Sequence, residues 1–198
     1  MLFVRSWLTP RQLRRLLSCW SCNAASQEVI CSQCGKIQPP QQEVNYFKVL
    51  HQEEKFTLRA QDLQKRFRDM QRVLHPDKFA NCSEKEKNFS ADQSALVNQA
   101  YQVLLKPIQR ATYLLQLKGI SLAEVQLSQE FLLEMMEFNE EIDRADDSKR
   151  EELLGQIAEF EELAMAELQE HFANKKLSEA SESLAKLKYF ENLRNRLS

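Results

Sequence analysis

The sequence predicts an all-α protein, and three features of the 198-residue chain lead to that class. Glycine and proline, which break helices most strongly, occur only 3 and 5 times, and no proline follows Pro107. Apolar residues in the second half of the chain recur at the helical period of three to four positions. No apolar run approaches the roughly 20 residues that a transmembrane helix requires. We therefore expect packed amphipathic helices with a core of their own.

Charge is divided unevenly along the chain. Charged residues make up 28% and hydrophobic residues 43% of the sequence, which excludes a chain that is disordered by composition or embedded in a membrane. Residues 44–118 contain 13 Lys and Arg against 8 Asp and Glu, a net +5, whereas residues 119–198 contain 9 against 19, a net −10. This split favours two domains with different partners, although two solvated surfaces of opposite bias explain the charge equally well.

Residues 1–18 have the composition of a mitochondrial presequence, a basic amphipathic helix that is removed after import. Leucine and aromatic residues interleave with the arginines, and the first acidic residue is Glu28. A secretory signal is disfavoured because the segment has no continuous apolar stretch. The alternative interpretation is a short basic tail on a cytosolic protein. The arginines that carry the charge are Arg5, Arg11, Arg14 and Arg15.

Two CxxC pairs, Cys19 with Cys22 and Cys31 with Cys34, are separated by eight residues. Four thiolates on two such turns can surround one tetrahedral zinc ion, and a segment with almost no core needs that metal to fold. Four sulfurs leave no open coordination position, so the predicted zinc is structural. A redox or disulfide role is the alternative, but the βαβ context of a thioredoxin-like motif is missing. Cys82 is isolated, and we expect it to be a plain thiol.

Helical signals begin at Asn45, after a polar linker over residues 35–44 that contains a double proline. The second expected helix must end at His75, because the residue before a proline is pushed out of the α region. The last three helices have short connections, so neighbours should be antiparallel in a small bundle. The expected helices cover a short segment around residues 46–50 and then residues 58–75, 83–105, 107–119, 128–145, 148–172 and 175–197.

The helix over residues 58–75 has two distinct faces. Its apolar positions recur at i, i+4, i+7 and i+11, which is one face of a helix. Three basic residues lie roughly opposite, at about 100° per residue, and form a face for water or for a partner. The apolar face consists of Leu63, Phe67, Met70 and Leu74, and the basic face of Lys65, Arg68 and Arg72.

The tripeptide His75-Pro76-Asp77 lies between two helices that we expect to be antiparallel, and by itself it reads as an ordinary turn. Here it follows the basic helix face and precedes a helix that carries the sequence VNQAY at residues 97–101. This combination resembles the J domain of the DnaJ class, over residues 45 to about 105. The resemblance implies that the tripeptide, with Lys65, Arg68 and Arg72, docks on a DnaK-type chaperone and triggers ATP hydrolysis by that chaperone.

The helix over residues 128–145 carries a second apolar patch outside its core stripe. The stripe is Phe131, Met135, Phe138 and Ile142, whereas Leu132, Leu133 and Met136 lie roughly 100–200° away from Phe131. Such a patch needs a second packing partner, and this partner can be either another helix of the same bundle or another protein. Charged residues flank the patch at Glu137, Glu140 and Arg144.

The sequence after residue 44 is also similar to the HscB subfamily of J proteins. The similarity is carried by LVNQAYQVLLKP from residue 96, RATYLL from residue 110, EFLLEMME from residue 130 and LKYF from residue 187. The two CxxC pairs are similar to the animal mitochondrial form of that subfamily. The resemblance implies a three-helix J domain, a three-helix C-terminal bundle and a small N-terminal zinc knuckle. It also implies that an IscU-type iron–sulfur scaffold binds the positions Leu132, Leu133, Met136, Glu137, Glu140 and Tyr189.

From these residues and resemblances we expect a co-chaperone of the mitochondrial matrix, with room for a cytosolic pool, that is not itself an enzyme. It would hold an IscU-type scaffold, present it to a DnaK/HscA-type chaperone and favour cluster transfer to recipient iron–sulfur proteins. A generic mitochondrial J protein that delivers unfolded clients is the alternative. Nucleic acid is disfavoured as a partner because no Lys or Arg lies between the CxxC pairs, and no membrane is expected. The expected segments are 1–18 (presequence), 19–34 (knuckle), 35–44 (linker), 45–118 (J domain and following helix) and 119–198 (scaffold-binding domain).

Overall fold

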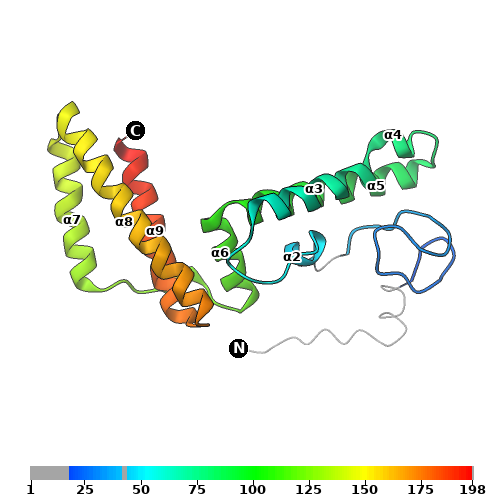
Figure 1. Ribbon diagram of the computed structural model, residues 1–198, viewed down its shortest axis with the longest axis horizontal. Coiled ribbons are helices and arrows are strands. Elements are labelled where there is room, and N and C mark those ends of the chain that lie inside the picture. Colours follow the sequence, from blue (N-terminus) through cyan, green and yellow to red (C-terminus); the bar gives the residue numbers. More distant parts are fainter. Residues whose placement is uncertain (1–17, 42–43, 198) are drawn as a thin grey trace. The chain divides into compact units, whose positions relative to one another are not determined.

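The computed structural model describes residues 18–41 and 44–197, so residues 1–17 of the expected presequence lie outside the described part of the chain. The described residues form helices and no strand, and their β pairing is limited to two isolated bridges (Figure 1). The all-α class predicted from the sequence is confirmed. The helices are α2 (Tyr46–Val49), α3 (Ala60–Leu74), α4 (Pro76–Phe79), α5 (Glu84–Leu105), α6 (Pro107–Leu117), η1 (Leu122–Glu124, a 3-10 turn), α7 (Gln129–Arg144), α8 (Asp147–Ala173) and α9 (Leu177–Leu197).

These helices belong to two compact units. Of the described residues, the first unit contains 18–41, 44–53 and Ala60–Gln102, and the second contains Glu54–Arg59 and residues 103–197. The division falls inside α5, so α6 belongs with the C-terminal helices, where it packs against α9. The division between the two units, after Gln102, therefore comes earlier in the chain than the boundary at residue 118 that the sequence led us to expect. None of the described helices combines the length and the apolar character needed to span a membrane.

In the first unit, α3 and α5 pack as an antiparallel pair. The ring of Phe67 stacks on that of Tyr101 with 4.2 Å between centroids, and Gln71 Nε2 donates a hydrogen bond to Asn98 Oδ1 at 3.1 Å. Helix α3 ends one residue before the expected His75, since that residue already has extended backbone angles and caps α4. The helix thus stops where the proline rule predicts.

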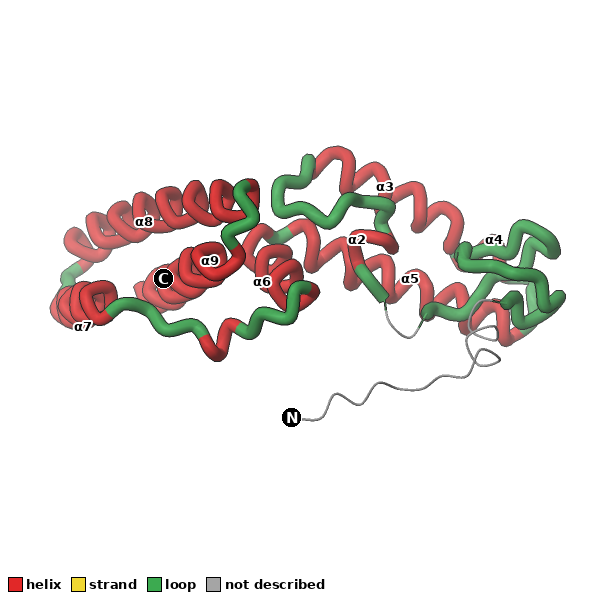
Figure 2. Tube along the Cα trace, turned by 90° about the horizontal axis from the view of Figure 1, so that it is seen from below, coloured by secondary structure: helices red, strands yellow, loops and turns green. Residues whose placement is uncertain are grey.

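In the second unit, α8 and α9 pack along each other as a hairpin, and α7 lies against both (Figure 2). The Phe138 ring of α7 lies 5.9 Å from that of Phe160 in α8, and the Phe131 ring lies 5.8 Å from that of Phe190 in α9. Every apolar residue of the expected α7 stripe is buried. Burial of such a side chain contributes about 1.5–3 kcal/mol relative to exposure, so this stripe is a main source of the bundle's stability.

A short segment before α3 completes the second unit. The Phe56 ring stacks on Phe172, near the end of α8, at 5.0 Å between centroids. The guanidinium of Arg110 lies 5.1 Å from the Phe56 ring and donates to the carbonyl oxygen of Leu104 at 2.5 Å. Burial lowers the pKa of Arg110, but the aromatic face and the carbonyl partly replace its lost hydration.

Candidate functional site

The four cysteines of the CxxC pairs form a candidate metal centre. Their sulfur atoms all lie within 4.8 Å of one another, with Cys19 Sγ 3.6 Å from Cys34 Sγ and Cys22 Sγ 3.8 Å from Cys31 Sγ. Sulfurs at the corners of a tetrahedron around an ion with 2.3 Å bonds would be about 3.8 Å apart. The thiols are free, and these separations far exceed a disulfide bond. The four cysteines therefore fit one tetrahedral metal ion.

The two CxxC turns have the same backbone conformation, repeated after twelve residues. Asn23 N donates to Cys19 O at 3.0 Å, and Gly35 N donates to Cys31 O at 2.8 Å. Asn23 and Gly35 both have left-handed φ angles, 59° and 70°, which glycine adopts freely and asparagine tolerates. Each turn is closed by one isolated bridge, Ser18–Ala25 and Ile30–Ile37. In the sequence, only the spacing of the cysteines and of Asn23 and Gly35 indicates this repeat.

The surroundings separate the pKa values of these thiols. Burial acts to raise the pKa of Cys19, but hydrogen bonds from the backbone of Cys22 and Ser21 and from neighbouring thiols lower it to about 6. The backbone of Lys36 acts to lower the pKa of Cys34, whereas burial and the other three sulfurs raise it to about 12. Four adjacent sulfurs cannot all be thiolates unless a cation lies among them. A bound metal ion would supply that charge.

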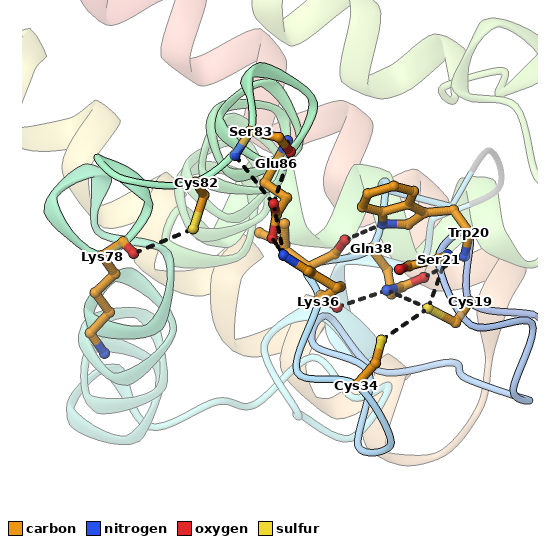
Figure 3. A network of polar contacts seen from close by, with 11 residues as sticks. Cys19, Trp20, Ser21, Cys34, Lys36, Gln38, Lys78, Cys82, Ser83 and Glu86 are labelled. Carbon is orange, nitrogen blue, oxygen red and sulfur yellow. Dashed lines mark hydrogen bonds and ion pairs between the residues drawn. The ribbon is translucent and has the colours of Figure 1, made fainter.

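The residues after the second pair dock on α5 through polar contacts (Figure 3). Lys36 Nζ lies 3.0 Å from Glu86 Oε1, and Gln93 Nε2 donates to the carbonyl oxygen of Gln38 at 3.1 Å. The amide of Gln38 in turn donates to Cys19 Sγ at 3.3 Å. A buried amide thus links a candidate metal ligand to the same backbone segment that α5 holds.

Apolar contacts reinforce the docking. Trp20 lies between the paired cysteines of the first turn, and its Nε1 donates to the carbonyl oxygen of Ile37 at 2.7 Å. Its ring meets Phe89 of α5 edge-on at 5.9 Å and lies 4.1 Å from Lys85 Nζ. Ile37 is fully buried. Residues 36–38 of the expected linker therefore hold the knuckle against α5.

The His75-Pro76-Asp77 tripeptide is exposed between α3 and α5. His75 caps α4, with its Nδ1 accepting a hydrogen bond from Asp77 N at 3.3 Å and lying 3.4 Å from Asp77 Oδ2. The side chains of His75 and Asp77 are 59% and 90% exposed, so both can reach a partner. Two features anchor the loop that carries these side chains. Phe79 is buried, and Ser90 Oγ donates a hydrogen bond to the carbonyl oxygen of Leu74 at 2.9 Å.

The predicted basic face of α3 is also exposed. The nearest partners of two of these cations lie on the same helix: Arg68 donates to Gln64 Oε1 at 3.5 Å, and Arg72 lies 3.6 Å from Asp69 Oδ1. Such surface contacts contribute about 0–1 kcal/mol and leave the cations available. The exposed residues of this face are Lys65, Arg68 and Arg72.

On α7 the predicted second apolar patch is exposed. Leu132 is 42% exposed and Leu133 and Met136 are each 61% exposed, while the stripe on the other side of the helix is buried. Glu137 and Glu140 are exposed beside them. No helix of the described chain covers this patch, so packing inside the bundle does not explain it. Large apolar side chains gathered on one exposed face are typical of an interaction surface.

Tyr189 of α9 is half-buried against α7. Its ring meets Phe131 edge-on at 5.8 Å, and its hydroxyl accepts a hydrogen bond from Asn139 Nδ2 at 2.9 Å. It therefore packs onto the helix that carries the exposed patch. Cys82, in contrast, lies outside the four-sulfur cluster, and its thiol contacts the carbonyl oxygen of Lys78 at 3.9 Å.

An exposed His-Pro-Asp loop between antiparallel helices, with a basic helix face before it, defines the first unit as a J domain. The DnaJ domain model matches residues 45–113, and that of the HSCB C-terminal oligomerisation domain matches residues 127–198. The chain belongs to the HscB family of co-chaperones, on these matches and on the relatives that follow.

Several HscB proteins resemble this chain over most of its length. The iron–sulfur cluster co-chaperone protein HscB of Mus musculus is 33% identical over 188 residues, covering 90% of this chain and 80% of the mouse protein. The Homo sapiens protein of the same name is 32% identical with the same coverage. The crystal structure of human HscB matches with a TM-score of 0.83 and 31% identity, over 91% of this chain and 96% of that one. The chaperone HscB from Vibrio cholerae matches with a TM-score of 0.67 and 31% identity, over 78% of this chain and 95% of its own.

Proposed function

We propose that this chain binds an IscU-type iron–sulfur scaffold protein and delivers it to a DnaK/HscA-type chaperone. The observation that carries the proposal is the apolar patch of Leu132, Leu133 and Met136, which is exposed on a helix whose other face is core. The relatives named iron–sulfur cluster co-chaperones suggest what kind of protein covers it. Glu137, Glu140 and Tyr189 complete the proposed surface.

The second half of the proposal concerns the J domain. His75, Pro76 and Asp77 would contact the chaperone together with the cations Lys65, Arg68 and Arg72. The exposure of the loop and its anchoring by Phe79 and Ser90 support this role, because a pre-ordered loop loses little conformational entropy on binding. The contact would stimulate ATP hydrolysis by the chaperone, while the chain itself would catalyse nothing.

The two proposed surfaces lie in stretches of the sequence that have opposite net charge. Residues 44–118 are net positive and residues 119–198 are net negative, so each stretch attracts a partner surface of the opposite charge. Both partners can therefore bind at once without competing for the same residues. Hydrolysis would then close the chaperone on the scaffold and favour transfer of its cluster to recipient iron–sulfur proteins.

The metal we propose is zinc, held by Cys19, Cys22, Cys31 and Cys34. Sulfur-only tetrahedral sites suit zinc, and four thiolates leave no position for substrate, so the ion would be structural. Elemental analysis of chain purified under reducing conditions should find about one zinc ion per chain. Purified protein that is folded yet free of zinc would contradict the assignment. The proposed location is the mitochondrial matrix.

A reconstitution tests the function as a whole. The chain, an IscU-type scaffold and a DnaK/HscA-type chaperone are purified, and ATP hydrolysis is measured for every combination. We expect the chain to raise the chaperone's rate and the scaffold to raise it further only when the chain is present. A generic J protein would give the same increase with an unfolded model client in place of the scaffold, and that result would contradict the proposal.

A further inference from the structure

The side-chain amide of Asn139 connects α7 to α9. Its Nδ2 donates to the carbonyl oxygen of Met135 at 2.7 Å and to the hydroxyl of Tyr189 at 2.9 Å. Its Oδ1 accepts a hydrogen bond from the guanidinium of Arg196, which also donates to Asp143 Oδ1 at 2.6 Å. Both hydrogens of the amide and its oxygen are therefore used.

This arrangement fixes the direction of each hydrogen bond. A backbone carbonyl can only accept, so the amide nitrogen must face Met135. A guanidinium can only donate, so the amide oxygen must face Arg196. A flipped amide would place its oxygen against the carbonyl oxygen of Met135, so that two acceptors would meet. It would also place its nitrogen against the guanidinium of Arg196, so that two donors would meet. Asn139 must consequently donate to the Tyr189 hydroxyl, which leaves the hydrogen of that hydroxyl free to donate elsewhere.

The hydroxyl lies beside the helix that carries the exposed patch. The Tyr189 ring packs edge-on against Phe131, the residue directly before Leu132 and Leu133. Among the described residues, no acceptor is hydrogen-bonded to the hydroxyl hydrogen. A half-buried tyrosine with an unused donor next to an apolar patch has the features of an interface anchor.

We infer that Asn139 is a positioning residue for scaffold recognition, because it presents the Tyr189 hydroxyl to the partner as a hydrogen-bond donor. The inference rests on the proposed scaffold-binding function. The scaffold would then offer an acceptor oxygen beside the apolar side chains that cover the patch.

A double-mutant cycle on scaffold binding tests the inference. Dissociation constants for an IscU-type scaffold are measured by calorimetry for the parent, Asn139→Ala, Tyr189→Phe and the double variant. We expect Tyr189→Phe to weaken binding roughly 2- to 10-fold, the range for one hydrogen bond between neutral groups. Asn139→Ala should weaken binding in the parent but cause no further loss in the Tyr189→Phe background, because its effect passes through the hydroxyl.

A purely structural role for Asn139 predicts a different cycle. Loosening of α7 from α9 through loss of the Arg196 contact, which Tyr189→Phe leaves in place, would lower affinity equally in both backgrounds. That additivity would overturn the inference, as would full binding by either single variant. If Asn139→Ala does not melt cooperatively, Asn139→Asp replaces it in the cycle. An aspartate keeps the acceptor for Arg196 but cannot donate, so it would draw the hydroxyl hydrogen to itself and give the same non-additive loss.

A third variant separates the two proposals. Leu132, Leu133 and Met136 are changed together to Ala, and scaffold binding is measured under the same conditions. If this variant binds weakly and the cycle is additive, the inferred role of Asn139 is overturned but the proposed scaffold surface is not. Full-strength binding by this folded variant overturns the proposed surface, and the inference with it.

Discussion

Lys36 Nζ lies 3.0 Å from Glu86 Oε1, and this ion pair joins the residue that follows the second CxxC turn to the first turn of α5. Glu86 is buried, and Ser83, which precedes α5, donates to it through both its backbone N–H and its hydroxyl, at 3.3 and 2.8 Å. The carboxylate therefore closes the start of the helix and holds the knuckle at the same time. The four-cysteine cluster and the helix that follows the His-Pro-Asp loop are coupled through it.

Removal of the metal should destabilise more than the knuckle. In Cys31→Ser the docked side chains Trp20 and Ile37 lose their support, and their exposure should lower the free energy of unfolding of the first unit by about 1–3 kcal/mol. The sequence alone, with a linker after the knuckle, predicts that only the knuckle unfolds. Hydrogen exchange across α5, compared between Cys31→Ser and the control Cys82→Ser, distinguishes the two. Unchanged protection of α5 would show that the docking contributes nothing.

The ion pair predicts a dependence of stability on pH. The hydrogen bond from Lys36, together with Ser83, holds the pKa of Glu86 below its usual value. A depressed pKa in the folded state gives stability that is present above the unfolded pKa and is lost as the pH falls through the folded pKa. The pair also raises the pKa of Lys36, so its contribution is lost again as the pH rises past that value.

Thermal melts of the parent and of Glu86→Gln between pH 3 and 7 measure the acidic side of this dependence. The parent should melt at the higher temperature at neutral pH, and the difference should narrow as the pH falls through the depressed pKa of Glu86 in the folded state. The two proteins are compared only at pH values at which both retain the metal, because an undocked knuckle would break the ion pair whether or not Glu86 is charged. A difference that stays constant with pH would mean that the charge of Glu86 is not the cause.

His75→Gln should abolish stimulation of the chaperone's ATPase without unfolding the J domain. The His75 side chain is 59% exposed, so its replacement leaves no cavity, and the anchors Phe79 and Ser90 are untouched. Steady-state ATP hydrolysis and a thermal melt provide the two measurements. Scaffold affinity should equal that of the parent, because the proposed scaffold surface belongs to the other unit.

The two faces of α7 should respond oppositely to truncation. Changing Leu132, Leu133 and Met136 together to Ala should leave the melt near that of the parent but weaken scaffold binding by 10-fold or more, since a buried interface anchor commonly contributes more than about 1 kcal/mol. The matched control is Met135→Ala on the buried face, which should cost about 2–5 kcal/mol of stability. If the triple variant does not melt cooperatively, these three residues belong to the core and not to an interaction surface.

The proposed matrix location depends on residues 1–18 as a presequence. Replacing Arg11, Arg14 and Arg15 with Glu reverses the charge that an import signal of this composition needs, so the protein should stay in the cytosol. Fractionation of cells that express each form measures this. Mitochondrial uptake equal to that of the parent would show that the import signal lies elsewhere in the chain.

Helix periodicity was sufficient to predict most of the fold. The stripe on α7 and the apolar face of α3 repeat within one helix, so local spacing reveals which side is buried. The exposed patch on α7 was also predictable, because its residues break that spacing. The packing of α6 on α9 was not, since it depends on which helices meet.

The docking of the knuckle on α5 is a second feature that periodicity could not predict. Trp20 meets Phe89 and Lys36 meets Glu86 across 50 or more residues, and no repeat in the sequence relates such partners. The double proline and polar composition of residues 35–44 suggested a spacer, but the burial of Ile37 and Gln38 depends on a surface formed by another part of the chain. The pairing around Asn139 is of the same kind.

The stacking of Phe56 on Phe172 limits how this protein can be divided or recombined. Because residues 54–59 lie before α3 yet complete the C-terminal unit, the chain passes between its two units three times, and a fragment that begins after the J domain would lack a piece of its own core. Phe172 and Arg110 would then face water without their aromatic neighbour. A chimera that exchanges C-terminal bundles between relatives should therefore carry the short segment before α3 along with the bundle, or restore an aromatic residue opposite Phe172.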